Sequence, residues 1–244
     1  MLYMIGTGIY DERDISQKAI DALKKSKKIY AEFYTCPVNV NLVALEKQAT
    51  KKIQVLDRKQ VEEQDTILDS AKKQPTAFLV GGDALSATTH TQLMLDAKKS
   101  GIEVKVIHAS SIFTAIAETG LQLYKFTKTI SLPFPQVNYF PTTPYTNLED
   151  NIGTGLHTLL LLDIGMTANT AIDILLDLEK KMKKNIFTKK TKLVVAAHLG
   201  GDSLIKYNTI ENLKKTDFGA LPHTIVIPGK LHFTEEEYLK TFRD

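Results

Sequence analysis

The stretch Ala77-Phe78-Leu79-Val80-Gly81-Gly82-Asp83 decides the expected fold, because an apolar run of strand length is followed at once by a glycine turn and a carboxylate. In a parallel α/β sheet the carboxyl ends of the strands lie along one edge, and the loops that leave them form the ligand crevice. We therefore expect one edge to gather most of the polar residues that follow apolar runs. Besides the stretch quoted above, these are Gly6-Thr7-Gly8, His108-Ala109-Ser110-Ser111, Asp163, His198-Leu199-Gly200-Gly201 and Pro228-Gly229-Lys230.

The first half of the chain alternates between predicted strands and predicted helices. Strands are expected at residues 2–5, 28–33, 52–56, 76–80 and 102–107, and helices at residues 42–49, 61–73 and 88–100. A further helix is expected to start at Asp14, an N-cap residue type that Gln17 follows at the spacing of a capping box. This alternation is typical of a parallel sheet covered on both faces, so we expect residues 1–110 to form one α/β domain.

The second half begins with a different pattern. A short helix is expected near residues 111–118 and strands at residues 129–132, 157–162, 193–197 and 224–227, with helices at residues 168–182 and 208–216. The Pro- and aromatic-rich stretch at residues 133–145 is longer than an ordinary connection, so we expect it to face either a substrate or a dimer partner. We expect residues 111–244 to form a second α/β domain.

Composition places the chain among globular proteins, with 244 residues, 43% of them apolar and 24% charged, and a net charge of +3. No basic stripe carries interleaved aromatic residues, so nucleic acid is not an expected partner. No apolar run approaches the roughly 18 residues needed to span a bilayer, and the first residues lack the charged flank of a signal peptide. We therefore expect a cytoplasmic protein that does not enter the membrane.

Neither a disulfide nor a metal centre is expected. Cys36 is the only cysteine, so one chain builds neither an intrachain disulfide nor a thiolate cluster. The six histidines lack the close spacing of paired metal ligands. A Walker loop and a Gly-x-Ser-x-Gly elbow are also absent, which removes most of the support for an NTPase or a hydrolase.

Three motifs each leave two interpretations open. Gly6-Thr7-Gly8 lacks the third glycine of the dinucleotide fingerprint, whose place Asp11 takes, so it is either a tight turn or a point where a ligand approaches the backbone. Asp83 either binds ribose hydroxyls or an amino group, or it or Ser86 caps the next helix, which the spacing slightly favours. The segment at residues 108–111 either holds a carboxylate or caps a helix.

Several segments read together resemble one known family, the diphthine synthases, which are S-adenosylmethionine-dependent enzymes of the tetrapyrrole methylase superfamily. The resemblance spans nearly the whole chain. In the first half it is carried by Tyr10-Asp11-Glu12-Arg13-Asp14-Ile15, Ala31-Glu32-Phe33-Tyr34-Thr35, Gly82-Asp83-Ala84-Leu85, Ala87-Thr88-Thr89-His90 and His108-Ala109-Ser110-Ser111-Ile112. In the second half it is carried by Tyr124-Lys125-Phe126, residues 155–164, Met166-Thr167-Ala168-Asn169, Asp217-Phe218-Gly219, Pro222-His223 and Pro228-Gly229-Lys230-Leu231-His232.

The resemblance implies two α/β domains of the tetrapyrrole methylase type, with the ligand cleft between them, in a protein that works as a homodimer. It implies transfer of methyl groups from S-adenosylmethionine, which leaves as S-adenosylhomocysteine. The acceptor is the α-amino nitrogen of a carboxy-aminopropyl group on a histidine of translation elongation factor 2, and the trimethylated product is diphthine. The residues that the resemblance assigns to the methyl donor are Ile9, Asp83, Ser86, Ser111, Ile112, Leu162, Leu199 and His223.

No residue needs to act as a nucleophile in such a transfer, because a sulfonium is already an activated methyl donor and the step mainly requires orientation. We expect the nearby sulfonium and partial desolvation to lower the pKa of the acceptor ammonium, so that no dedicated base is required. Two residues depart from the family pattern: Ala84 and Ser110 stand where the family has prolines, and both changes remove backbone rigidity near the donor. The pattern around residues 198–202 is loose, which makes Leu199 the weakest of the assignments.

Two other functions remain as alternatives. A tetrapyrrole C-methyltransferase would share the fold, although residues 10–15 and 31–35 favour the diphthine synthases. A non-catalytic protein that binds S-adenosylmethionine would keep the pocket without turnover, and Ala84 and Ser110 make that alternative conceivable. A methyl-transfer assay separates the two classes.

Overall fold

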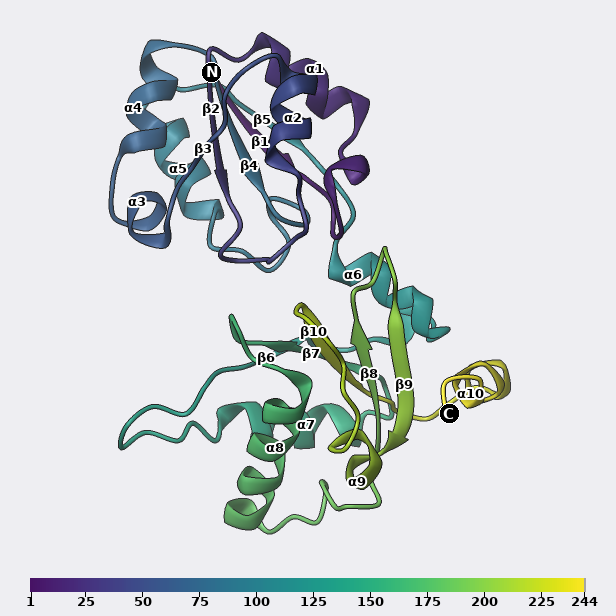
Figure 1. Cartoon of the computed structure of the whole chain (residues 1–244). Helices are drawn as coiled ribbons and strands as arrows, with labels where there is room; N and C mark the ends of the chain where they lie inside the picture. The colour runs from purple at the N-terminus through teal and green to yellow at the C-terminus, as the bar shows by residue number, and fades with distance from the viewer. Residues whose placement is uncertain (244) are drawn as a thin grey trace. The chain divides into compact units, whose positions relative to one another are not determined.

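The computed structural model describes residues 1–243, and it divides the chain into two compact units, Met1–Ala115 and a second that begins at Ile116. Figure 1 shows the elements of each unit. Each unit contains its own five-stranded sheet.

The first unit is built on a sheet with the strand order β3-β2-β4-β1-β5. All neighbouring strands pair in parallel, as the strand–helix alternation predicted. The strands are β1 (Leu2–Gly6), β2 (Lys28–Glu32), β3 (Gln54–Val55), β4 (Thr76–Val80) and β5 (Val104–Ile107). The central strand β4 is buried at every residue, which explains its uninterrupted apolar sequence.

Helices cover both faces of this sheet (Figure 1). On one face, apolar residues of α1 (Gln17–Lys25) and α2 (Leu42–Ala49) pack against Ile5, Ala77 and Leu79. On the other face, α4 (Thr66–Lys73) and α5 (Thr91–Lys99) pack against Met4 and Phe78. The remaining helices of the unit are short: η1 (Glu12–Asp14), α3 (Arg58–Glu62) and α6 (Ile112–Ala115).

The start of α1 differs from the prediction. Ser16 is the N-cap of α1, and its side chain accepts a hydrogen bond from the backbone N–H of Ala19. Asp14, the expected cap, accepts instead from the backbone N–H of Tyr10 at 2.8 Å. Both residue types serve as caps, and the sequence does not show which of two neighbouring candidates lies at the end of the helix.

The second unit contains a mixed sheet with the strand order β6-β7-β10-β8-β9. Only β6 and β7 pair in parallel, and β10 runs antiparallel to both β7 and β8. The strands are β6 (Ile130–Leu132), β7 (Thr158–Leu162), β8 (Lys192–Ala197), β9 (Leu204–Thr209) and β10 (His223–Ile227). The helices are η2 (Ile116–Thr119), η3 (Leu123–Lys125), α7 (Thr143–Gly153), α8 (Ala168–Met182), α9 (Ile210–Leu213) and α10 (Phe233–Lys240).

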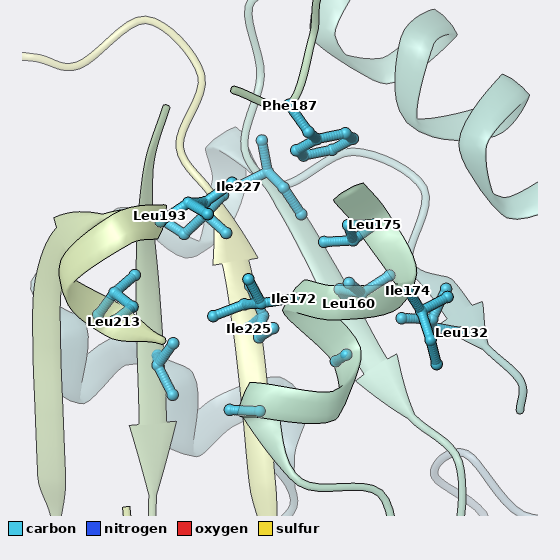
Figure 2. Packing of buried hydrophobic residues seen from close by; sticks show 14 of the residues in the cluster. Leu132, Leu160, Ile172, Ile174, Leu175, Phe187, Leu193, Leu213, Ile225 and Ile227 are labelled. Carbon is cyan, nitrogen blue, oxygen red and sulfur yellow. The ribbon is translucent and has the colours of Figure 1, made fainter. Parts of the chain in front are cut away.

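The core of the second unit lies between its sheet and α8 (Figure 2). Ile172 and Leu175 of α8 face Leu160 and Ile225 of the sheet, and Phe187 closes one end of the cluster. All five side chains are at most 1% exposed. Because these side chains are buried, α8 is held against β7 and β10. The first turn of α8 is therefore held at one edge of the sheet.

Two predictions for the second unit are wrong. Residues 143–153 form helix α7 rather than ending an extended loop, because Pro144 fits the first turn of a helix and Tyr145 and Leu148 bury one face. Residues 208–216 were expected to be one helix, but β9 extends to Thr209 and α9 covers only four residues. The missed signal is the alternation in β9, where Ile205 and Tyr207 are buried between less buried neighbours.

Candidate functional site

The glycine turns after β1 and β4 meet at the carboxyl edge of the first sheet. The backbone of Gly8 and that of Gly82 exchange two hydrogen bonds, from Gly8 N to Gly82 O at 3.2 Å and from Gly82 N to Gly8 O at 2.8 Å. A β-carbon added at Gly6 would lie 2.5 Å from Gly82 O and 2.8 Å from the β-carbon of Ala109. Gly6 is therefore a point where three loops approach too closely for any other residue. The prediction that one edge collects these motifs is confirmed for the first unit.

Asp83 is the centre of the hydrogen bonding at this edge. Its Oδ1 accepts from the backbone N–H of Leu85 at 3.0 Å and from the hydroxyl of Ser86 at 3.3 Å. Its Oδ2 accepts from the backbone N–H of Ala109 at 3.0 Å and from Nδ1 of His108 at 2.8 Å. Asp83 thus joins the loop after β4 to the loop after β5. The alternative that Asp83 or Ser86 caps the next helix is wrong, since α5 begins after His90.

These hydrogen bonds keep Asp83 ionised. Burial alone would raise the pKa of this carboxyl, but the N–H groups of Leu85 and Ala109 and the ring of His108 outweigh it and hold the pKa below its usual value. A carboxylate with a lowered pKa is a poor proton acceptor near neutral pH, but it is well suited to accept hydrogen bonds from hydroxyls or ammonium groups.

The other expected donor residues of the first unit lie on the same loops. Ile9 follows Gly8 and is half-buried, and Ser86 is half-buried within the turn that Asp83 begins. Ser111 is buried, and its hydroxyl accepts from the backbone N–H of Phe113 in the first turn of α6, where Ile112 is the first residue. The capping interpretation of the segment at residues 108–111 is therefore confirmed for Ser111.

In the second unit, Leu162, Leu199 and His223 lie at one edge of the mixed sheet. Leu162 ends β7 and Leu199 follows the end of β8, while His223 begins β10. Because β10 is antiparallel to both neighbours, its first residue lies beside their last residues: His223 pairs with Ala197 and Thr224 with Leu161. The strand directions bring these three residues together at one edge.

His223 has a defined neutral tautomer. Its Nδ1 accepts from the backbone N–H of Ala168 at 3.2 Å, and its Nε2 donates to the carbonyl oxygen of Ala220 at 2.9 Å. Burial lowers the pKa of His223 and outweighs the backbone hydrogen bond to Ala220, which raises it, while His198 adds a smaller lowering contribution. Both ring nitrogens are occupied, so His223 holds the start of α8 and does not offer a free base at this edge.

Glu118 supports the turn between β8 and β9. Its carboxylate accepts from the backbone N–H of Gly200 at 3.0 Å and from the hydroxyl of Ser203 at 2.7 Å. Within the turn, His198 has a left-handed backbone with φ of 54°. No local sequence pattern marks Glu118, because its partners are 82 and 85 residues away.

The segment Pro228-Gly229-Lys230 does not lie at this edge and is an exception to the expectation that one edge gathers most of the motifs. It leaves the far end of β10, where Ile227 pairs with Thr158 at the start of β7. The N–H of Gly229 donates to Nδ1 of His157 at 2.9 Å. The physical reason is strand direction: β10 is antiparallel to its neighbours, so its carboxyl end reaches the opposite edge from theirs.

Glu32 and His90 form a buried pair in the first unit to which the sequence analysis assigned no role. The two side chains are at most 2% exposed, and Nε2 of His90 lies 2.9 Å from Oε1 of Glu32. A glutamate at the end of an apolar strand is an unusual pattern and is the signal that could have identified it, since buried carboxylates require partners.

Residues 1–243 contain neither a cluster of metal ligands nor a membrane-spanning helix. Within these residues, His, Cys, Asp and Glu side chains form no group of three or more that could hold a metal ion. Every helix in the same range is too short or too polar to cross a membrane.

The two-sheet fold and the glycine-rich edge of the first unit are those of a known family of enzymes. Residues 1–213 match the family of tetrapyrrole (corrin/porphyrin) methylases, and the chain belongs to that family. It is therefore a methyltransferase, and membership implies S-adenosylmethionine as the methyl donor.

Within that class the chain is similar to the diphthine synthases, and this similarity assigns it the activity of a diphthine synthase. The diphthine synthases of Methanococcus maripaludis and Methanocaldococcus jannaschii are each 47% identical, over 98% of this chain and 98% of their own. A solved diphthine synthase structure has a TM-score of 0.89 at 33% identity and covers 100% of this chain and 96% of that one. A solved structure from Entamoeba histolytica has a TM-score of 0.94 at 36% identity and covers 100% of this chain and 98% of that one.

Proposed function

We propose that this chain transfers methyl groups from S-adenosylmethionine to the α-amino nitrogen of a carboxy-aminopropyl group on a histidine of translation elongation factor 2. Three transfers to one nitrogen would give the trimethylammonium group of diphthine. The acceptor assignment rests on the diphthine synthases that are 47% identical over nearly the whole chain. A cytoplasmic location follows from this proposal, since translation takes place there.

The observation that carries the proposed donor site is the ionised Asp83 at an edge where glycine turns leave room for a ligand. Apart from its two chain neighbours, a β-carbon added at Gly82 would meet no heavy atom of the described residues 1–243 within 4 Å, so there is free space beside Gly82. The carboxylate of Asp83 accepts hydrogen bonds, which suits the hydroxyl and ammonium donors of S-adenosylmethionine. We assign donor contacts to Ile9, Asp83, Ser86, Ser111 and Ile112 of the first unit and to Leu162, Leu199 and His223 of the second.

When bound, S-adenosylmethionine supplies a methyl group that is already activated by its positive sulfur. The residues of this chain bind and orient. Asp83 is held by four hydrogen bonds and stays ionised, and His223 uses both ring nitrogens to hold its neighbours. Neither is placed to take the proton that the acceptor ammonium must lose, so we assign that loss to solvent, helped by desolvation and by the nearby positive sulfonium.

The proposal extends to a homodimer, on the resemblance to the family. The loop at residues 133–142 is a candidate surface for the acceptor protein or for the second copy, because Val137 is 91% exposed and Tyr139 is 59% exposed. Sedimentation of the chain alone and with the elongation factor distinguishes the two roles. A Val137→Glu variant should weaken whichever association uses the loop.

The proposed function is tested by the intact mass of elongation factor 2 that carries the carboxy-aminopropyl histidine, before and after incubation with this protein and S-adenosylmethionine. A gain of whole methyl units on that histidine is the expected result, and three units would establish trimethylation. No gain from a protein that binds S-adenosylhomocysteine would overturn the acceptor assignment and would favour a non-catalytic binding protein.

A further inference from the structure

The segment at residues 81–89, here called the donor segment, carries Asp83 and Ser86 and begins where β4 ends. Its conformation is not one that the chain adopts freely. Gly82 has a left-handed backbone with φ of 72°, and Ala87, which has a side chain, also has a positive φ of 59°. A non-glycine residue in the left-handed region is disfavoured and persists only where the surrounding structure fixes it. What fixes the two ends of the donor segment therefore matters for any ligand that it binds.

Glu32 lies beside the first end of the donor segment. As the last residue of β2 it pairs in register with Val80, the residue that precedes the segment. Its carboxylate also holds the loop after β2, since Oε2 accepts from the N–H of Thr35 at 3.1 Å and Oε1 accepts from the Thr35 hydroxyl. The next residue, Cys36, packs directly on the segment, because a β-carbon added at Gly81 would lie 2.6 Å from the carbonyl oxygen of Cys36.

Glu32 also reaches the second end. His90 directly follows the donor segment and precedes α5, and its Nε2 lies 2.9 Å from Oε1 of Glu32. The His90 ring packs edge-on against Phe78 at 5.2 Å between centroids, which fixes it against the core. One buried carboxylate thus contacts His90 at the second end directly, and it reaches the first end through Thr35, whose neighbour Cys36 packs on Gly81. The geometry does not require this pair for the fold of β2 and β4, whose ladder is complete without it.

We propose that Glu32 and His90 are positioning residues for methyl transfer, which fix both ends of the donor segment in the conformation that binds S-adenosylmethionine. The inference rests on the proposed donor site. Neither side chain contacts the reacting atoms in this account. They act through Asp83 and Ser86, whose positions depend on where the segment begins and ends.

The test is a substitution that keeps the size of the side chain and changes its hydrogen bonding. In Glu32→Gln a single carbonyl oxygen replaces an acceptor that faced three donors, so the segment is held for only part of the time. The apparent Kd for the ligand equals the intrinsic Kd divided by the fraction of molecules whose donor segment is in the binding conformation. If that fraction is about one tenth, the Kd for S-adenosylhomocysteine rises about tenfold, while kcat at saturating S-adenosylmethionine stays close to wild type. A KM effect without a kcat effect separates positioning from general damage.

The second unit supplies a matched control. Glu235 and His157 form another buried pair, with 3.1 Å between Oε1 and Nε2 and at most 1% exposure. Glu235→Gln removes the same charge from an equally buried site that is outside the donor segment. It should lower the thermal midpoint as Glu32→Gln does and leave the Kd for S-adenosylhomocysteine within about twofold of wild type, since it does not change the competent fraction.

Hydrogen exchange in the absence of ligand gives a second measurement, in which amides of residues 84–90 should exchange faster in Glu32→Gln than in wild type. His90→Gln, which keeps an N–H donor, should retain more affinity than His90→Leu. If Glu32→Gln does not fold, Thr35→Val removes only one of the three donors and should weaken binding about threefold by the same population argument.

Two negative results are distinguishable. A folded Glu32→Gln with wild-type Kd and wild-type exchange at residues 84–90 would overturn the inference and leave the proposed function intact. A wild-type chain that does not bind S-adenosylhomocysteine would overturn the proposed function, and the positioning role would fall with it. Calorimetry on the full chain gives the Kd for both tests, and hydrogen exchange gives the second readout for Glu32→Gln.

Discussion

The two sheets of this molecule differ in where they send their loops. In the first unit all five strands run parallel, so every loop that follows a strand reaches one edge, and the loops after β1, β4 and β5 meet there through Gly8, Gly82 and Asp83. In the second unit β10 runs against its neighbours. His223 therefore lies beside the ends of β7 and β8, and Pro228-Gly229-Lys230 leaves from the opposite edge.

The difference shows that strand direction, rather than the presence of a polar motif after a strand, decides which motifs meet. A motif that follows a strand lies beside the motifs that follow its parallel neighbours. A motif that follows an antiparallel strand is separated from them by the length of the strand. It also explains why the residue that begins β10 is a candidate for the site and the residues that end it are not.

Gly6→Ala should have the largest effect. The added methyl group would lie 2.5 Å from a backbone oxygen that cannot move away without breaking the Gly8–Gly82 bridge. We expect a loss of about 3 kcal/mol or more in the free energy of unfolding, measured by chemical denaturation. Gly153→Ala, in α7 of the second unit, has open space around it and should stabilise by up to about 1 kcal/mol. Equal effects at the two sites would contradict the close approach at Gly6.

Glu235→Gln should have the next largest effect, on stability rather than on binding. Burial alone would raise the pKa of Glu235, but the N–H of His232, the ammonium of Lys125 and other donors lower it to about 2. A folded-state pKa below the unfolded value of about 4.3 stabilises the protein above that value, and the stabilisation is lost as the pH falls toward 2. Wild type should therefore lose a few kcal/mol between pH 5 and pH 2 by this route.

Glu235→Gln should be less stable than wild type at neutral pH and should lack this part of the acid dependence. Denaturant titrations at several pH values measure both quantities. His157 adds a smaller change at higher pH: burial lowers its folded pKa despite the bond to Glu235, so its stabilising effect is lost as the pH falls below about 6.5. If the free energy of unfolding of Glu235→Gln fell between pH 5 and pH 2 as steeply as that of wild type, Glu235 would not be the source of this acid dependence.

Asp83→Asn should weaken donor binding more than Asp163→Asn does. The Asp83 carboxylate accepts four hydrogen bonds at the edge of the first sheet, and an amide has one acceptor oxygen for them. We expect the Kd for S-adenosylhomocysteine to rise roughly tenfold to a hundredfold, from a loss of about 1.5–3 kcal/mol. Asp163, which is exposed and accepts from two backbone N–H groups, should change the Kd less than about threefold. A larger rise in Kd for Asp163→Asn than for Asp83→Asn would indicate that the donor binds mainly to the second unit.

Ala84→Pro should have the smallest effect. Ser86 N donates to Asp83 O at 3.2 Å, so residues 83–86 form a β-turn with Ala84 at its second position, where proline is favoured. We expect the free energy of unfolding to rise by about 0.5 kcal/mol and donor binding to tighten slightly. Ala87→Pro is the control: its φ of 59° is incompatible with the proline ring, so it should destabilise. Thermal denaturation of the two variants compares them directly.

The sequence predicted the parts of the fold that depend on local pattern. The parallel sheet of the first unit follows from apolar runs such as residues 76–80, which are fully buried in β4. The helix α7 and the strand β9 were missed, although Pro144 and the alternation at Ile205 and Tyr207 carried local signals for them. The direction of β10 has no local signal, because an apolar run has the same pattern in either direction.

For the site, the sequence placed Asp83 at the edge but could not identify what it binds within the protein. Its partners include Ala109, 26 residues away, and Glu32 and His90 are separated by 58 residues. Such pairs depend on how β2, β4 and β5 are ordered in the sheet, and that order is a property of the whole unit. The resemblance to a family supplied the proposed donor residues, and the structure shows which strands and loops carry them.

The most direct test of the account is hydrogen exchange of the full chain with and without S-adenosylhomocysteine. We predict protection at residues 81–90 and 108–112 of the first unit and at residues 162–163, 198–199 and 223 of the second, with none at residues 228–230. Protection at residues 228–230, or its absence at residues 81–90 in a chain that binds the ligand, would contradict the claim that strand direction selects which loops of each unit carry donor-binding residues.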